Sequence, residues 1–163
     1  MKQLAEECAG NHVALVAPET ASLLTLLIEC GRYRRILEIG TGLGYSTIIL
    51  ARAAARNHGT VATIERLPQR VERAREYFDL SGLTNICSYA GEAQDVLPHL
   101  TGFFDFIFLD AAMGQYADFF RDLFPKLSPG GLLAADNVLF ENLISRSRFQ
   151  VPRRRRTMQQ RLR

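Results

Sequence analysis

Short apolar segments alternate along the chain with longer amphipathic ones. Five runs are rich in β-branched and aromatic residues and have the length of buried strands. They cover residues 36–39, 60–65, 85–90, 104–110 and 132–137. Helical patterns cover residues 19–30, 44–56, 68–82, 92–99 and 116–124. This alternation predicts an α/β fold with a doubly wound, mostly parallel sheet and right-handed crossovers.

Composition is that of a globular domain with its own core. The chain has 163 residues, of which 47% are hydrophobic and 23% charged, and no apolar run reaches the roughly 20 residues that span a bilayer. Its three cysteines lack a C-x-x-C spacing, so we expect reduced thiols in a cytoplasmic protein. We predict one domain over residues 1–145, with 146–163 as an Arg-rich C-terminal segment of it.

Positive charge is concentrated at the C-terminal end. The net charge is +3. Residues 146–163 contain eight arginines and no acidic residue, so the preceding 145 residues carry a net charge of 3 − 8 = −5. Arg153 to Arg156 form an unbroken block. Such a block is compatible with a solvated helix face, a disordered end or a contact to a polyanion such as RNA phosphate.

A glycine-rich turn follows the first predicted strand. Gly40, Gly42 and Gly44 are spaced two apart and lead directly into a helical run. Glycine lets backbone approach a ligand closely, and a helix N-terminus offers free N–H groups. The turn therefore predicts a binding site for a nucleotide-like cofactor.

Polar residues end three of the predicted strands. Glu65 ends the second strand, Asp110 the fourth, and Asp136 with Asn137 the fifth. Ligands of doubly wound sheets bind outside the carboxyl ends of the strands, so these side chains are expected to converge. A carboxylate at position 65 suits a grip on ribose hydroxyls, although a solvated strand-end charge is the alternative.

A dinucleotide is the first competing cofactor. The NAD fingerprint G-x-G-x-x-G requires a third glycine where this chain has Tyr45. The substitution argues against the nicotinamide oxidoreductase that this alternative implies.

Several motifs resemble one enzyme family. The segment 37–46, Leu-Glu-Ile-Gly-Thr-Gly-Leu-Gly-Tyr-Ser, resembles motif I of the class I S-adenosylmethionine-dependent methyltransferases, and Thr63-Ile-Glu65 resembles their ribose-binding acid. The segments 91–98, 106–116 and 130–140 resemble the cation-dependent O-methyltransferases of the catechol type. The family implies a Rossmann-like sheet, which we expect to lack its last two strands in this chain, and commonly a homodimer.

The resemblance also implies site residues. S-adenosylmethionine contacts are implied at Val16, Glu38, Gly40, Tyr45, Ser46, Glu65, Ala93, Gln94 and Asp110. A divalent cation, Mg²⁺ or another, is implied at Asp110, Asp136 and Asn137, which makes Asp110 the catalytic residue. Chemistry supports the metal independently, because carboxylate and amide oxygens are hard ligands suited to Mg²⁺. A turn pair that caps the following segment is the alternative for Asp136 and Asn137.

One residue departs from the family pattern and bears on the acceptor. Met113 stands where relatives often carry a lysine that resembles a general base, and a thioether cannot take a proton. The motifs are most similar to the bacterial branch that methylates 5-hydroxyuridine in tRNA, whose adjacent hydroxyl and carbonyl resemble a catechol. With the arginine block as a phosphate contact, we favour tRNA. Small catechol or phenolic acceptors, and a truncated non-catalytic S-adenosylmethionine-binding protein, are the alternatives.

Overall fold

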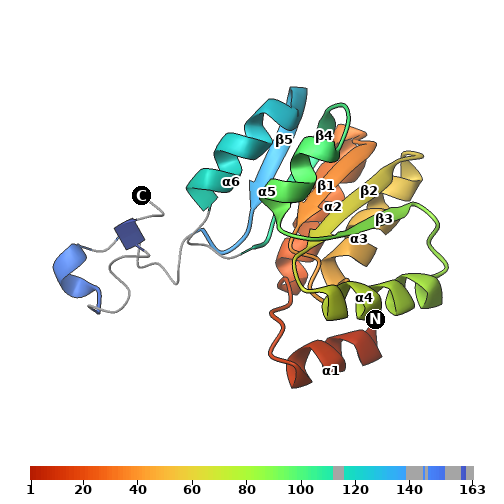
Figure 1. The fold of residues 1–163 in the computed structure, drawn as a ribbon, viewed down its shortest axis with the longest axis horizontal. Helices are drawn as coiled ribbons and strands as arrows, with labels where there is room; N and C mark the ends of the chain where they lie inside the picture. Colours follow the sequence, from red (N-terminus) through yellow and green to blue (C-terminus); the bar gives the residue numbers. More distant parts are fainter. Residues whose placement is uncertain (112–115, 139–144, 146, 153–158, 161–163) are drawn as a thin grey trace.

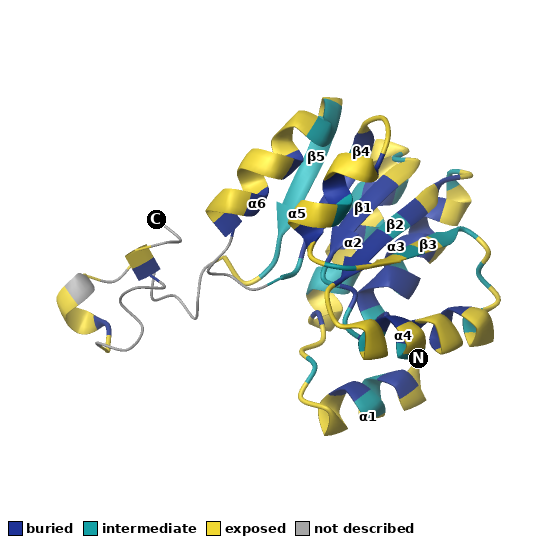
Figure 2. Cartoon of the chain, in the orientation of Figure 1, coloured by how far each residue is buried: buried dark blue, intermediate teal, exposed yellow. Residues whose placement is uncertain are grey.

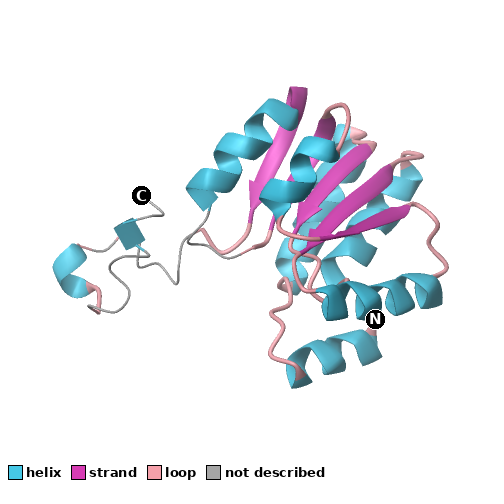
Figure 3. Ribbon diagram, in the orientation of Figure 1, coloured by secondary structure: helices cyan, strands magenta, loops and turns pink. Residues whose placement is uncertain are grey.

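The computed structural model describes residues 1–111, 116–138, 145, 147–152 and 159–160. Their central feature is a sheet of five parallel strands in the order β3-β2-β1-β4-β5 (Figures 1 and 3). The strands are β1 (Arg35–Ile39), β2 (Thr60–Glu65), β3 (Ile86–Ala90), β4 (Phe104–Leu109) and β5 (Leu127–Ala135). The predicted α/β class and parallel sheet are confirmed.

Helices precede the sheet and connect its strands. The α-helices are α1 (Lys2–Gly10), α2 (Pro18–Gly31), α3 (Tyr45–Arg56), α4 (Pro68–Ser81), α5 (Ala93–Val96) and α6 (Tyr116–Leu123). The 3₁₀ turns are η1 (Leu97–His99), η3 (Phe124–Lys126) and η4 (Arg148–Gln150). In the described part of the chain, no helix is long and apolar enough to cross a membrane.

Side chains that alternate along the strands build a core on each face of the sheet. Leu37 and Ile107 pack with α5 and α6 on one face, whereas Ile36 and Phe106 pack with α2 and α3 on the other. Because both faces are covered, apolar residues occupy five of the six positions of β4 and three of the five positions of β1. Burial is concentrated in these central strands and in the inner sides of the helices (Figure 2).

Three elements differ from the pattern-based prediction. β5 begins at Leu127, and its register against β4 is irregular, so residues 128–131 lie within the strand instead of forming a separate turn before it. The strand ends at Ala135, before Asp136, and Asn137 has a left-handed φ of 58°. The predicted helix 92–99 divides into α5 and a 3₁₀ turn that contains Pro98, a residue without an N–H donor. The first residues, which we assigned no element, form α1.

The strand order reverses between β1 and β4. From β1 the chain moves outward to β2 and β3, then returns to place β4 and β5 on the other side of β1. A crevice forms at such a switch point outside the carboxyl ends of the two central strands. Ile39 and Leu109 are the register-paired last residues of these strands, so Gly40 and Asp110 enter the crevice side by side. The domain boundary at residue 145 stays a prediction.

Asp105 ties three strands together at the opposite end of the sheet. Its Oδ2 accepts backbone N–H bonds from Arg34 at 3.1 Å and Arg35 at 3.0 Å, and its Oδ1 accepts the Ser128 hydroxyl at 3.1 Å. Burial acts to raise the pKa of Asp105, but the hydrogen bonds from Arg35, Arg34 and Ser128 outweigh it and hold the pKa below its usual value. The ionised form is therefore the one that the fold stabilises.

We expect Asp105→Ala to lower the free energy of unfolding by about 1–3 kcal/mol at pH 7, because two backbone N–H groups and a hydroxyl lose their acceptor. Asp105→Asn is the matched control, since its amide has an acceptor oxygen and a donor group for the same partners. Urea unfolding at pH 7 and pH 3 measures both. Because the native pKa is depressed, the carboxylate's contribution is present above the unfolded pKa and is lost as pH falls through the native pKa. Asn should lack this acid-dependent loss, and equal stabilities for Ala and Asn at pH 7 would contradict the assignment.

Candidate cofactor and metal site

The glycine turn between β1 and α3 fits closely against the end of β4. Gly40 has a φ of 104°, and a Cβ added there would lie 2.0 Å from the carbonyl oxygen of Asp110. Gly44, the N-cap of α3, has a φ of 93°, and its Cβ would meet the Phe78 ring at 2.5 Å. Any side chain at these positions would clash as well as strain the backbone, so the turn requires glycine for packing.

A buried carboxylate lies directly beneath this turn. Glu38 has no exposed surface and accepts hydrogen bonds from the Ser46 hydroxyl at 2.6 Å, the Thr63 hydroxyl at 2.6 Å and the Thr47 hydroxyl. Thr63 in turn lies 2.6 Å from Thr41, oxygen to oxygen. Since Thr63 gives its proton to Glu38, Thr41 must donate to Thr63. The network joins β1, β2, α3 and the turn itself.

Burial and hydrogen bonding act in opposite directions on Glu38. Burial raises its pKa, the three hydroxyl donors lower it, and the nearby Asp110 raises it further, to a net value of about 7. The carboxyl group thus changes its protonation state near neutral pH. Both of its oxygens are used within the protein, so the structure gives it a supporting position under the turn.

Glu65 lies at the end of β2 and faces the same turn. Its Oε2 accepts the Gly42 N–H at 2.9 Å, and its Oε1 accepts the Leu67 N–H at 3.0 Å. The side chain is buried, with 5% of the residue exposed. Each oxygen accepts one backbone N–H and keeps a further lone pair, so the carboxylate is held in place and can still accept hydroxyl donors from a ligand.

A cavity of about 350 Å³ opens at this edge of the sheet. Its lining includes seven of the nine predicted cofactor residues: Val16, Gly40, Tyr45, Ser46, Glu65, Ala93 and Asp110. Of the other two, Glu38 lies beneath the turn and Gln94 is exposed on α5. The predicted convergence of strand-end residues is therefore observed, while the roles of these residues toward a ligand stay predictions.

The structure adds a wall to the cavity that the sequence patterns did not indicate. The lining also includes Cys8 of α1 and the segment 12–15. Two cations belong to it as well: Arg66, which precedes α4, and Arg70 in the first turn of α4. His12 is exposed, has a left-handed φ of 53°, and also lines the cavity. No local pattern in these first residues specifies where they dock.

Asp110 and Asp136 follow neighbouring strands. Leu109 and Ala135 are register partners, and the Asp136 N–H donates to the Leu109 carbonyl at 3.0 Å, so the two carboxylates leave adjacent strand ends. Burial raises the pKa of Asp110, and the negative charge of Asp136 raises it further, to about 6. Each carboxylate therefore lies within range of the other's negative charge.

Asn137 completes the predicted metal set. Its N–H donates to the Asp136 Oδ1 at 2.7 Å, and it lines the cavity together with Asp110. Among the described residues, no group of three or more His, Cys, Asp and Glu side chains could hold a metal ion. The predicted set contains only two such side chains, Asp110 and Asp136, because its third ligand is the amide oxygen of Asn137. It is therefore a different kind of group from a cluster of three such side chains.

Two predicted features lie outside the described residues. Met113, which stands at the position of the family lysine, is one of them, and the arginine block from Arg153 to Arg156 is the other. The expected reduced thiols agree with three free cysteines, of which Cys8 is buried and Cys30 and Cys87 are exposed.

Known proteins decide which family this site belongs to. The sequence model of the family described as O-methyltransferase matches residues 1–162. The chain belongs to the O-methyltransferase family. The catechol O-methyltransferase of Niastella koreensis is 38% identical over 136 residues, which cover 80% of this chain and 61% of that protein. A protein-L-isoaspartate O-methyltransferase of Nitrobacter winogradskyi is 37% identical over 118 residues, or 72% of this chain and 51% of that protein.

Solved structures of O-methyltransferases share the fold. The O-methyltransferase TomG of Streptomyces achromogenes, solved in complex with SAM, matches with a TM-score of 0.85 and 29% sequence identity. The match covers 99% of this chain and 73% of TomG. The chain therefore has the fold of an O-methyltransferase, and it spans 61% and 51% of the two curated relatives named above.

We expect Gly40→Ala to lower the free energy of unfolding by about 2–4 kcal/mol, because backbone strain is combined with a clash against the Asp110 carbonyl. Gly82→Ala is the control: Gly82 also has a positive φ, of 69°, but nothing lies within 4 Å of the added carbon. It should cost about 1 kcal/mol from strain alone. Denaturant unfolding measures both, and similar losses in the two variants would show that the close approach at Gly40 contributes nothing.

The raised pKa of Glu38 predicts a pH-dependent stability. A native carboxyl that holds its proton up to pH 7, against an ordinary value of 4.5, loses stability relative to the unfolded chain as pH rises through that window. Glu38→Gln removes the titration, so the stability of the wild type relative to Gln should fall by about 3 kcal/mol between pH 4.5 and 7.5. Urea unfolding across that range tests this, with the exposed Glu92→Gln as control. A difference between wild type and Glu38→Gln that is the same at every pH would refute it.

Proposed function

We propose that this chain is an S-adenosylmethionine-dependent O-methyltransferase that binds its cofactor in the cavity beside the glycine turn. One observation carries the proposal: the turn, the Glu65 carboxylate and the two acids of β4 and β5 meet at one edge of the sheet, and all but Asp136 line one cavity. Membership in the family and the SAM complex of TomG support the choice of cofactor. A cofactor without a pyrophosphate also agrees with Tyr45 in place of a third fingerprint glycine.

The cavity offers suitable partners to the ribose and to the methionine end of this cofactor. Glu65 would accept the ribose hydroxyls, because its two oxygens are held apart by separate backbone amides. Gly40 lines the same cavity, and its backbone would lie beside the methionine end. Asp110 lines the same cavity from β4, where a carboxylate suits the positive charge of the sulfonium and amino groups.

Asp110, Asp136 and Asn137 would hold a divalent cation. The donor set is made of hard oxygens, and the repulsion that raises the pKa of Asp110 is the arrangement that a cation would relieve. When bound, such an ion lowers the pKa of a coordinated hydroxyl group and fixes its direction of approach. Asp110 is then the residue shared by the cofactor and metal sites, which is why we assign it the catalytic role.

The reaction transfers one methyl group between two oriented groups. The acceptor oxygen forms a bond to the methyl carbon as the bond from that carbon to sulfur breaks, which leaves S-adenosylhomocysteine. The acceptor hydroxyl would give up its proton to water. An acceptor with two neighbouring oxygens fits this site best, because one would be methylated while the other completes the grip on the ion.

Two kinds of acceptor offer such a pair of oxygens. The relative named catechol O-methyltransferase favours a small catechol. The arginine block favours 5-hydroxyuridine in tRNA, with phosphate contacts from Arg153 to Arg156. The tRNA acceptor, a homodimer and cytoplasmic location stay predictions.

The purified chain should bind S-adenosylhomocysteine and not NAD in isothermal titration calorimetry. It should then transfer a labelled methyl group to a catechol or to bulk tRNA in the presence of Mg²⁺. Chelation, and Asp136→Ala, should each lower turnover at least about 100-fold while leaving cofactor binding within about threefold, because the ion holds the acceptor.

Each outcome of this panel points to one reading. Methylation of tRNA with a strong dependence on salt supports the RNA acceptor, and methylation of the catechol alone supports the small one. Cofactor binding with no turnover on either acceptor would refute the enzymatic proposal in favour of a binding protein. Undiminished turnover of Asp136→Ala in chelator would refute the metal site.

A further inference from the structure

The N-terminal segment lies directly on the proposed cofactor cavity. Cys8 of α1 and residues 12–16 line it together with Glu65 and Gly40. A Cβ added to Gly42 would lie 3.0 Å from Val13 Cγ1, so the segment also touches the glycine turn. This wall comes from a different part of the chain than the strand ends, and its placement depends on where α1 docks.

Few apolar contacts hold α1 in place. Of its nine residues only Leu4 and Cys8 are buried, in a cluster with Tyr77 and Phe78 of α4. In Figure 1, α1 lies beside α4 and away from the sheet. An element with so little buried apolar surface opens at a low free-energy cost unless other contacts retain it.

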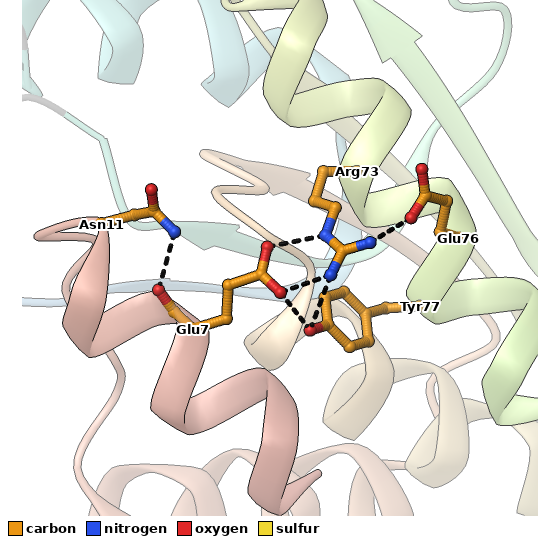
Figure 4. Close-up of polar contacts among 5 residues, drawn as sticks. All are labelled: Glu7, Asn11, Arg73, Glu76 and Tyr77. Carbon is orange, nitrogen blue, oxygen red and sulfur yellow. Dashed lines mark hydrogen bonds and ion pairs between the residues drawn. The ribbon is translucent and has the colours of Figure 1, made fainter.

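A polar cluster between α1 and α4 supplies such contacts. It consists of Glu7 on α1 and of Arg73 and Tyr77 on α4, and we name it the α1–α4 latch. Arg73 Nε donates to Glu7 Oε1 at 2.6 Å, and a second guanidinium nitrogen donates to Oε2 (Figure 4). The Tyr77 hydroxyl donates to the same Oε2 at 2.5 Å. Arg73 also stacks on the Tyr77 ring, 4.8 Å from its centre. Two-point pairing of this kind defines direction as well as distance.

Glu7 and Arg73 of the latch are ionised at every pH at which the protein would be assayed. The hydrogen bonds from Arg73 and then Tyr77 lower the pKa of Glu7 to about 2. The hydrogen bond to Glu7 likewise raises the pKa of Arg73 above its ordinary value. A change in latch strength therefore requires a change of residue and does not follow from pH.

We propose that Glu7, Arg73 and Tyr77 are positioning residues that retain the N-terminal wall over the bound cofactor and thereby set how long the cofactor stays. The inference rests on the proposed function. Arg70, one turn before Arg73 on α4, lines the cavity itself, so the helix that carries the latch also borders the site. Release of α1 removes the wall formed by residues 8–16 and its contacts with Gly42 and Leu43 of the glycine turn, and it leaves the acids that follow β4 and β5 in place.

The test compares two carboxylates that contact the same arginine. Glu7→Gln should raise the dissociation constant of S-adenosylhomocysteine about three- to tenfold, chiefly through faster dissociation, since the weakened pair lies at the protein surface. Glu76→Gln is the matched control: Glu76 also pairs with Arg73, but it lies on α4 and does not reach α1. It should change the constant by less than about twofold. Calorimetry gives the affinity, and surface plasmon resonance with the protein immobilised gives the dissociation rate.

A charge exchange keeps the test decisive if one variant folds poorly. Glu7→Arg and Arg73→Glu should each weaken binding, and the double variant should restore it to within about threefold of wild type. Hydrogen exchange of residues 1–16 should rise in both single variants and fall again in the double. Wild-type affinity in Glu7→Gln, or losses that multiply in the double variant, would overturn the latch alone. Failure of the wild type to bind S-adenosylhomocysteine would overturn the proposed function, and the latch with it.

Discussion

The hydrogen bonding of the buried Glu38 carboxyl group is the interaction on which the site depends. Glu38 is the penultimate residue of β1, just before the glycine turn, and three hydroxyls from α3 and β2 donate to it. A buried carboxyl group without hydrogen-bond partners would be very unfavourable in either protonation state. The hydroxyls of Ser46, Thr47 and Thr63 therefore have to lie where they do, and this requirement sets the start of α3 relative to β1 and β2.

Close backbone packing extends this constraint across the sheet. With the turn held from below, Gly40 lies against the Asp110 carbonyl, at a distance that leaves no room for a side chain. The ends of β1 and β4 are thus fixed to one another, and the register of β4 with β5 brings Asp136 beside Asp110. Cofactor cavity and acid pair are consequently parts of one rigid edge, whereas the N-terminal wall is attached by a small apolar cluster and the α1–α4 latch.

Local chemistry made most of the sheet and several site residues predictable. Strand runs such as 104–110 are apolar at most positions, and glycines spaced two apart before a helix have few structural uses other than a close approach. The two acids were placed correctly at neighbouring strand ends because the strand order of such folds is constrained. Errors occurred where local signals were weak. Residues 128–131 have turn composition, yet they continue β5, since pairing with β4 outweighs the local preference.

By itself, the sequence determined the alternation of strands and helices, the glycine turn and the identity of the acids, because each depends on neighbours within a few positions. Tertiary structure alone decided which of these residues can reach a ligand. Glu38 and Glu65 each lie at or near a strand end in the sequence. In the structure Glu38 accepts hydrogen bonds from buried hydroxyls, whereas Glu65 lines the cavity. The same holds for Glu7, whose partners Arg73 and Tyr77 lie 66 and 70 positions away. Contacts over such separations arise from packing, which no local pattern records.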